Sequence, residues 1–346
     1  MKHFLPHMVV LCRADYLPAR ASGKMRAMPH TPALPSVLAR AASQPDVLHW
    51  RCWTALAPGP ALIIMGAVHG NEVCGAHACA ALMEDLDAGR LTLTRGRLTV
   101  VPVANPLAFA RGTREGEGNL NRRFVPQPAP ASNEARIAAQ LAPLLGRHDA
   151  LLDLHSFHTP GAPFAMVGPL DNAGTREPFA RAAEEMALAC ALGAPRVVQG
   201  WLEVYDQAAR ARGEQPGDEG IGTNEYMRRC GGYAVTLECG LHTDAAAITV
   251  ARRAIDGALA HLGMAALPAP APFAGQVARL RRVVLREAAG DALARDWHSF
   301  APVRAGELIA RRASGAELRA PFDGCVLFPH PDAAVGEEFF YLAQLD

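Results

Sequence analysis

Up to about residue 262, the chain alternates between short apolar runs and longer segments whose apolar residues recur with a helical period. Apolar runs bounded by turn residues predict buried strands, and a period of about 3.6 residues predicts helices. Strands are expected over residues 47–56, 61–68, 98–104, 150–155 and 233–239. Helices are expected over residues 71–87, 133–145, 177–192 and 244–262. Because the strands are apolar on both faces and alternate with helices, the pattern predicts an α/β fold with a mixed, mostly parallel sheet flanked by helices.

The pattern changes at both ends of this region. Residues 1–45 are rich in proline, alanine and arginine and show no period, which predicts a loose and disordered N-terminal extension, with a true start at Met25 or Met28 as an alternative. Residues 267–272 alternate proline with small residues and predict a linker. Beyond it, short apolar runs with glycine and proline turns predict a small all-β domain over residues 273–346. The main α/β domain is therefore expected over residues 46–266.

Composition excludes several classes of protein. The 346 residues carry a formal net charge of zero, which argues against a nucleic-acid-binding or membrane-surface protein. No stretch approaches the roughly 20 apolar residues of a membrane span, and the apolar patch over residues 8–12 is too short for a signal peptide. The eight cysteines include no Cys-x-x-Cys pair, which is typical of buried thiols in a reducing compartment. We therefore expect a cytoplasmic protein.

Polar residues stand at the ends of four predicted strands. In open α/β sheets the ligand site lies beyond the carboxyl ends of the strands, so these side chains are expected to converge although they are far apart in sequence. They are His69, Asn105, His155 and Glu238.

His69, Glu72 and His155 form a candidate metal site. Two imidazoles and one carboxylate, with the fourth position open, are the ligand set of a catalytic zinc ion. The His-x-x-Glu spacing alone is weak evidence for a metal site. Glu72 would also be favourable at a helix N-terminus, and His69 would also be favourable in a turn. Asp153 shares a strand face with His155 and can orient its ring, as metal-bound histidines require. The sequence therefore predicts one zinc ion per chain, with Asp153 behind His155.

Two further features left alternatives open. Glu238 lies in an apolar strand, where a carboxylate needs a role as general base or a buried ion-pair partner. A glycine-rich loop over residues 111–124 carries four arginines that either bind a substrate carboxylate at the site or form a solvated surface. These arginines are Arg111, Arg114, Arg122 and Arg123.

Four motifs together resemble the succinylglutamate desuccinylase/aspartoacylase family, which belongs with zinc carboxypeptidases of the M14 type. They are Gly-Asn-Glu at residues 70–72, Asn-Leu-Asn-Arg at residues 119–122, Asp-Leu-His at residues 153–155 and Thr-Leu-Glu-Cys-Gly at residues 236–240. The resemblance runs in order from about residue 60 to residue 262, and the small β domain also fits it.

The resemblance implies a role for each matching residue. His69, Glu72 and His155 match the zinc ligands, and Glu238 matches the general base. Arg114 matches the arginine that polarises the scissile carbonyl, and Asn121 and Arg122 match the pair that holds a substrate carboxylate. The implied activity is hydrolysis of the amide bond, or in some members an ester bond, of an N-acyl amino acid or related small carboxylate.

The C-terminal segment resembles a barrel-sandwich module of the biotinyl or lipoyl kind. It contains no lysine, because the only lysines are Lys2 and Lys24, so it cannot carry an amide-linked prosthetic group. We expect it to cap or rim the site, or to mediate self-association into a homo-oligomer.

Two other functions share the residues named so far. One is an M14-type carboxypeptidase or murein-peptide amidase, and the other is a catalytically inactive binding protein that kept the fold. The aromatic residues of the segment over residues 197–229 have no assigned role, and the acyl group and amino acid of the substrate are not specified. These aromatic residues are Trp201, Tyr205 and Tyr226.

Overall fold

The computed structural model describes residues 34–346 apart from residues 123, 175–176, 215–219 and 346. The predicted extension over residues 1–45 therefore lies largely outside the described residues, together with both alternative start positions. Its last part differs from the prediction, because α1 (Ser36–Ser43) is a helix with Leu38 and Ala41 buried. These two residues are three apart and so share one helix face. That face packs against small apolar residues near the start of α2, which gives the segment a place in the core.

An 11-stranded mixed sheet forms the body of the protein, in the order β1-β3-β2-β4-β7-β5-β6-β8-β14-β13-β10. Its first seven strands in the chain are β1 (Arg51–Thr54), β2 (Ala61–Gly66), β3 (Arg97–Val101), β4 (Ala150–Phe157), β5 (Phe164–Met166), β6 (Arg196–Gln199) and β7 (Tyr233–Leu241). The pairs β3–β2, β2–β4, β4–β7, β5–β6 and β6–β8 are parallel. The predicted α/β fold with a mixed sheet is confirmed.

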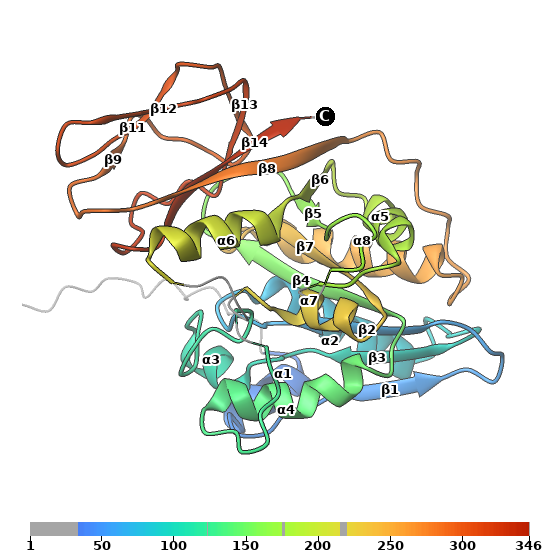
Figure 1. The fold of residues 1–346 in the computed structure, drawn as a ribbon. Helices are drawn as coiled ribbons and strands as arrows, with labels where there is room; N and C mark the ends of the chain where they lie inside the picture. Colours follow the sequence, from blue (N-terminus) through green and yellow to red (C-terminus); the bar gives the residue numbers. More distant parts are fainter. Residues whose placement is uncertain (1–33, 123, 175–176, 215–219, 346) are drawn as a thin grey trace, which may run out of the picture. The chain divides into compact units, whose positions relative to one another are not determined.

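Helices cover both faces of this sheet (Figure 1). α2, α5 and α8 pack on one face, and α4 and α7 pack on the other. Successive residues of β2 point to opposite faces of the sheet. Leu62 and Ile64 pack with α2, α5 and α8, while Ile63 and Met65 pack on the side of α4 and α7. The helices after α1 are α2 (Cys74–Asp87), α3 (Pro106–Arg111), α4 (Asn133–Leu145), α5 (Ala182–Ala191), α6 (Trp201–Ala211), α7 (Thr223–Arg229) and α8 (Ala246–His261). None of the described helices has the length and apolar character of a membrane span.

The C-terminal strands continue the main sheet. Residues 267–272 form no helix or strand, and β8 (Gln276–Leu285) then pairs in parallel with β6. β14, β13 and β10 follow in antiparallel order, and a second sheet of order β12-β11-β9 lies in the same segment. These strands are β9 (Ala292–Leu293), β10 (Ala301–Val303), β11 (Leu308–Arg311), β12 (Glu317–Arg319), β13 (Gly324–Leu327) and β14 (Glu338–Leu345). They enclose an apolar cluster of their own.

Candidate active site

The three residues predicted to bind a metal lie together in the structure. The ligand atoms of His69, Glu72 and His155 are within 4.8 Å of one another, and all three side chains are buried. His69 Nδ1 lies 2.9 Å from Oε1 of Glu72, and His155 Nδ1 lies 2.8 Å from Oε2 of the same carboxylate. The Nδ1 atoms of both rings therefore face one carboxylate, although His155 is distant from the other two residues in sequence.

Local structure holds these side chains in place. His69 and Glu72 lie in the loop between β2 and α2, since α2 begins at Cys74 and not at the predicted residue 71. A Cβ atom on Gly70 would lie 2.0 Å from the backbone carbon of Ala108, so only glycine permits this loop to pack against α3. The backbone N–H of Ser156 donates to Oε2 of Glu72 at 3.1 Å and links the loop to β4.

Oxygen atoms contact the outer nitrogen of each histidine ring. Nε2 of His69 lies 3.2 Å from Oδ1 of Asn119, and Nε2 of His155 lies 3.2 Å from Oδ2 of the fully buried Asp153. The His69 contact is a hydrogen bond and the His155 contact is an ion-pair contact with a carboxylate, and both favour the proton on Nε2 and leave Nδ1 free to bind a metal. Asp153 lies where the sequence analysis expected it. Asn119 received no role there, although it stands in the same motif as Asn121 and Arg122.

Two of the three side chains, His69 and Glu72, have the protonation state that metal binding requires. Burial lowers the pKa of His69 to about 4, so its imidazole is neutral near pH 7. Burial opposes ionisation of Glu72, but the adjacent His69 and His155 hold its pKa well below the usual range. Burial also opposes protonation of His155, but Asp153 and Glu72 raise the pKa of this ring well above its ordinary value. Metal binding would therefore displace a proton from His155.

The donor set fits a zinc ion. Nδ1 of His69 is buried, and its 2.9 Å contact with Oε1 of Glu72 does not count as a hydrogen bond, so a cation bound by both atoms would satisfy an otherwise unused lone pair. Two imidazole nitrogens and one carboxylate match the ligand preference of zinc, whereas magnesium and calcium prefer oxygen ligands alone. His69, Glu72 and His155 are therefore the residues that would hold it.

Glu238 lies beside this centre. On β7 it is the register partner of His155 on β4, and it is 8% exposed. Its Oε2 atom makes no hydrogen bond to any described residue, so the alternative of a buried ion pair with an arginine is not seen in this part of the chain. Burial, reinforced by the charge of Glu72, raises the pKa of Glu238 well above its usual value. A nearby cation would act in the opposite direction and favour the carboxylate.

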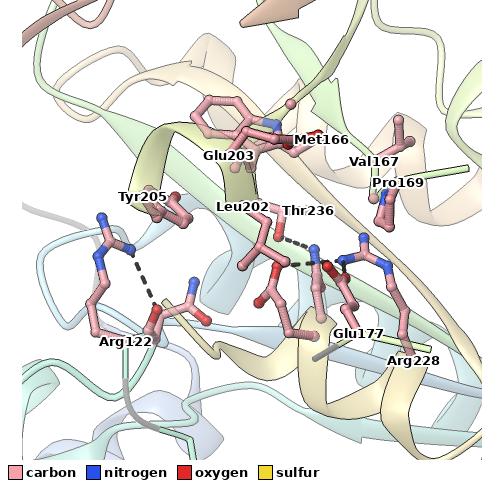
Figure 2. Close-up of a pocket in the computed structure, with 16 residues that line it drawn as sticks. Arg122, Met166, Val167, Pro169, Glu177, Leu202, Glu203, Tyr205, Arg228 and Thr236 are labelled. Atoms are coloured by element: carbon pink, nitrogen blue, oxygen red, sulfur yellow. Dashed lines mark hydrogen bonds and ion pairs between the residues drawn. The ribbon is translucent and has the colours of Figure 1, made fainter. Parts of the chain in front are cut away.

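Two arginines of the glycine-rich loop reach the same cavity. Arg114 donates from Nη1 to Oε1 of Glu72 at 2.7 Å and is 46% exposed. The guanidinium of Arg122 stacks on the ring of Tyr205 at 4.5 Å, and among the described residues its side chain donates a long hydrogen bond of 3.4 Å to the carbonyl of Asn121 (Figure 2). Arg111 donates to the carbonyl of Gly116 outside the cavity lining, and Arg123 lies outside the described residues.

Asn121 is linked to the outer layer of the metal site through Thr223. Its Oδ1 atom accepts a hydrogen bond from the backbone N–H of Thr223 at 3.0 Å. The hydroxyl of Thr223 in turn donates to Oδ2 of Asp153 at 2.6 Å. Because its oxygen is engaged, Asn121 can offer a ligand only its amide N–H groups.

These residues line a cavity of about 370 Å³. The C-terminal segment contributes Phe328, His330, Glu337, Glu338 and Tyr341 to its wall. A second hollow of about 30 Å³ adjoins it and shares Arg122, Tyr205 and four other lining residues with it. Figure 2 shows Arg122 beside Tyr205 at one end of this hollow, and Arg228 with Glu177 at the other.

Several residues took roles that the sequence analysis had not assigned. Trp201 and Tyr205 of α6 line the cavity, whereas Tyr226 packs against Phe124 with ring centroids 5.2 Å apart. Asn105 does not join the site, because its side chain caps α3 and donates to Glu134 at 3.0 Å. His242, a possible site neighbour from its place just after Gly240, lines the cavity, and its Nδ1 atom lies 2.8 Å from the hydroxyl of Ser156.

Known sequences similar to this chain include a family model and a curated relative. Residues 58–262 match the family model of the succinylglutamate desuccinylase/aspartoacylase catalytic domain. One curated relative, the N-alpha-acetyl-L-2,4-diaminobutyric acid deacetylase of Halomonas elongata, is 34% identical over 101 residues. That match covers 28% of this chain and only 29% of the relative's length.

Solved structures have the same fold. The product-bound ectoine utilization protein EutE of Ruegeria pomeroyi is 25% identical, with a TM-score of 0.64 over 85% of this chain and 88% of that one. A succinylglutamate desuccinylase of Silicibacter is 23% identical, with a TM-score of 0.66 over 86% of this chain and 89% of that one. A succinylglutamate desuccinylase/aspartoacylase of Rhodobacter sphaeroides is 20% identical, with a TM-score of 0.67 over 86% of this chain and 88% of that one.

Proposed function

The chain belongs to the succinylglutamate desuccinylase/aspartoacylase family, and we propose from this premise that it is a zinc-dependent deacylase of N-acyl amino acids. The observation that carries the proposal is the approach of His69, Glu72 and His155 to within 4.8 Å in a cavity that also contains Glu238 and Arg114. A metal-ligand triad, a buried carboxylate and a cationic donor are the groups that hydrolysis of an amide or ester requires.

The metal and the protein have separate tasks in this reaction. His69, Glu72 and His155 would hold a zinc ion, which would activate a water molecule and polarise the scissile carbonyl group. Glu238 accepts a proton from the attacking water and delivers it to the leaving nitrogen. Its Oε2 atom forms no hydrogen bond with a described residue and is available for both transfers. Its burial keeps competing water away from the carboxylate.

Arg114 and Arg122 bind different parts of the substrate. Arg114 is anchored to Glu72 by one N–H group and is half exposed, so its other donors can face the carbonyl oxygen as negative charge develops there. Arg122 holds the substrate carboxylate, because its stacking on Tyr205 fixes a planar guanidinium on the wall of the cavity, where its geometry suits a carboxylate. Asn121 contributes an amide N–H group and positions the neighbouring Arg122.

The size and lining of the cavity favour this proposal over the carboxypeptidase and murein-peptide amidase alternatives. Five residues of the C-terminal segment form part of its wall, and its volume of about 370 Å³ suits a small acylated amino acid. A peptide chain would need an open groove on the leaving-group side. An inactive binding protein would not need the unpartnered carboxylate of Glu238 next to a metal-ligand triad.

A substrate panel and a metal assay test the proposal together. Purified protein should contain about one zinc ion per chain and should release free amino acid from at least one member of a panel of N-acyl amino acids. Removal of the metal by a chelator should abolish this activity, and added zinc should restore it. Full activity in the metal-free protein, or activity on peptides alone, would overturn the proposal.

A further inference from the structure

His242 lies beside the metal-ligand triad and has no task in the proposed reaction. It follows β7 and is half-buried on the wall of the active-site cavity. Its Nδ1 atom lies 2.8 Å from the hydroxyl of Ser156. Ser156 is 2% exposed, and its backbone N–H donates to Oε2 of Glu72 at 3.1 Å. One buried residue therefore links the ring of His242 to a metal ligand.

A β-bulge at the carboxyl end of β7 places His242 at this point. Over residues 238–241, β7 advances three residues where β4 advances two. Gly240, within this bulge, has a φ of +121°, a conformation that residues with a Cβ atom rarely adopt. Beyond it, the backbone N–H of His242 donates to the carbonyl of Phe157 at 2.9 Å and keeps the turn attached to β4. Bulges are found where a strand re-aims a side chain next to an active site.

The contact with Ser156 determines which nitrogen of His242 carries the proton. Burial lowers the pKa of His242 and outweighs the opposing charge of Glu72, so the ring is neutral near pH 7. A neutral imidazole has one N–H group and one acceptor nitrogen. The buried hydroxyl of Ser156 needs an acceptor, and Nδ1 supplies one. The proton then lies on Nε2, on the side of the ring away from Ser156, where it can meet a ligand in the cavity.

Arg114 and the Ser156–His242 pair approach Glu72 at its two different oxygens. Arg114 donates to Oε1 at 2.7 Å, whereas the backbone N–H of Ser156 donates to Oε2. The guanidinium and the imidazole both line the cavity together with His155. A carbonyl group presented to this centre can therefore accept from one cationic and one neutral donor. Donors aimed at an oxygen on which charge develops stabilise the transition state more than the ground state.

We infer that the Nε2–H group of His242 donates a hydrogen bond to the oxygen of the scissile carbonyl, so that His242 is a second catalytic donor beside Arg114. This inference rests on the proposed deacylase function. Ser156 is then a positioning residue, because its hydroxyl holds Nδ1 and sets both the tautomer and the orientation of the ring.

Two amide substitutions separate the donor from the contact with Ser156. In His242→Gln the amide nitrogen can take the place of Nε2, whereas in His242→Asn the shorter amide reaches only the place of Nδ1. His242→Asn and His242→Ala should each lower kcat by about 100-fold with little change in KM, the usual cost of one such donor. His242→Gln should retain at least about a tenth of kcat, because it restores a neutral N–H group.

The role of Ser156 has its own readouts. Ser156→Ala removes the hydroxyl and keeps the backbone N–H that bonds Glu72. It should lower kcat, and the loss in the double variant Ser156→Ala/His242→Ala should be smaller than the product of the two single losses, since the residues act as a unit. Nitrogen NMR of the zinc-loaded protein with isotope-labelled histidine should show His242 protonated on Nε2, its signal being identified by its loss in His242→Gln. Protonation on Nδ1 alone would contradict the inference.

A matched control makes the same substitution elsewhere. His261→Gln changes an exposed histidine at the end of α8 outside the cavity lining, and it should alter neither kcat nor KM. Zinc content and thermal melting of each variant show whether the fold and the metal site are intact.

Binding of methylphosphonate tests the donor without turnover, because this probe has a tetrahedral anionic centre. Calorimetry on the zinc-loaded protein should show binding weakened by about 10-fold in His242→Asn and nearly unchanged in His242→Gln. Equal kcat values in these two variants would mean that His242 only supports Ser156, and they would overturn the inference. Unchanged methylphosphonate binding in His242→Asn would overturn it as well. If no N-acyl amino acid is hydrolysed, the proposed function fails, and the calorimetry alone decides whether His242 is a donor at this centre.

Discussion

The role of Asp153 behind His155 can be tested by graded substitutions. Asp153 is fully buried, and one of its oxygens, Oδ2, contacts both Nε2 of His155 at 3.2 Å and the hydroxyl of Thr223 at 2.6 Å. Asp153→Asn can keep this oxygen as an acceptor, but it removes the charge and replaces the other oxygen with an NH2 group. Asp153→Ala removes the acceptor as well and leaves a cavity beneath the ring.

The structure sets the order of the expected effects. Loss of a carboxylate behind a metal-bound histidine typically weakens metal binding by about 10- to 100-fold. For Asp153→Asn we expect the smaller, 10-fold loss of zinc affinity, about 1.4 kcal/mol of binding free energy, because the contact to His155 remains. For Asp153→Ala we expect the larger, 100-fold loss of zinc affinity, about 2.7 kcal/mol of binding free energy. Thr223→Val removes one hydrogen bond from the same oxygen and should weaken zinc binding less than either.

The assay is a competition titration of the metal-free protein against a zinc indicator at fixed pH. Circular dichroism and thermal melting of the metal-free variants serve as controls for folding. If folded Asp153→Ala binds zinc as tightly as the unaltered protein, Asp153 does not support the metal site. If Thr223→Val has the largest effect, the hydroxyl rather than the carboxylate orients the ring.

Three further predictions concern catalysis and stability. Glu238→Gln should keep zinc and the fold while kcat falls by about 100-fold or more, and near-normal turnover would refute its role as general base. Arg122→Ala should mainly raise KM for a carboxylate-bearing substrate and Arg114→Ala should mainly lower kcat; the reverse pattern in steady-state kinetics would show that the two assignments are exchanged. Leu38→Ala should lower the free energy of unfolding by about 2–5 kcal/mol in a urea titration, because this side chain of α1 is fully buried, and an unchanged midpoint would mean that α1 does not contribute to the fold.

The sequence was most informative where local patterns decide structure. The apolar runs that became β2, β4 and β7 were predicted to within a few residues, because each is buried on both faces and cannot be confused with an amphipathic helix. The convergence of His69, His155 and Glu238 followed from the rule that ligand sites lie at the carboxyl ends of parallel strands. The same rule failed for Asn105, whose side chain caps a short helix that the pattern did not predict.

Tertiary structure decided what depends on contacts between distant segments. α6 and α7 are short, and no sequence feature placed Trp201 and Tyr205 at the cavity or Thr223 beside Asp153. The extension predicted before residue 46 contains a helix, since Leu38 becomes buried in a cluster that includes Ala67, Val103 and two alanines of α2. The strand pattern of residues 338–345 gives no sign that a bulge turns Glu338 and Tyr341 towards the same cavity. Alternation along one strand specifies two faces, but only the register against a neighbouring strand determines where that alternation is interrupted.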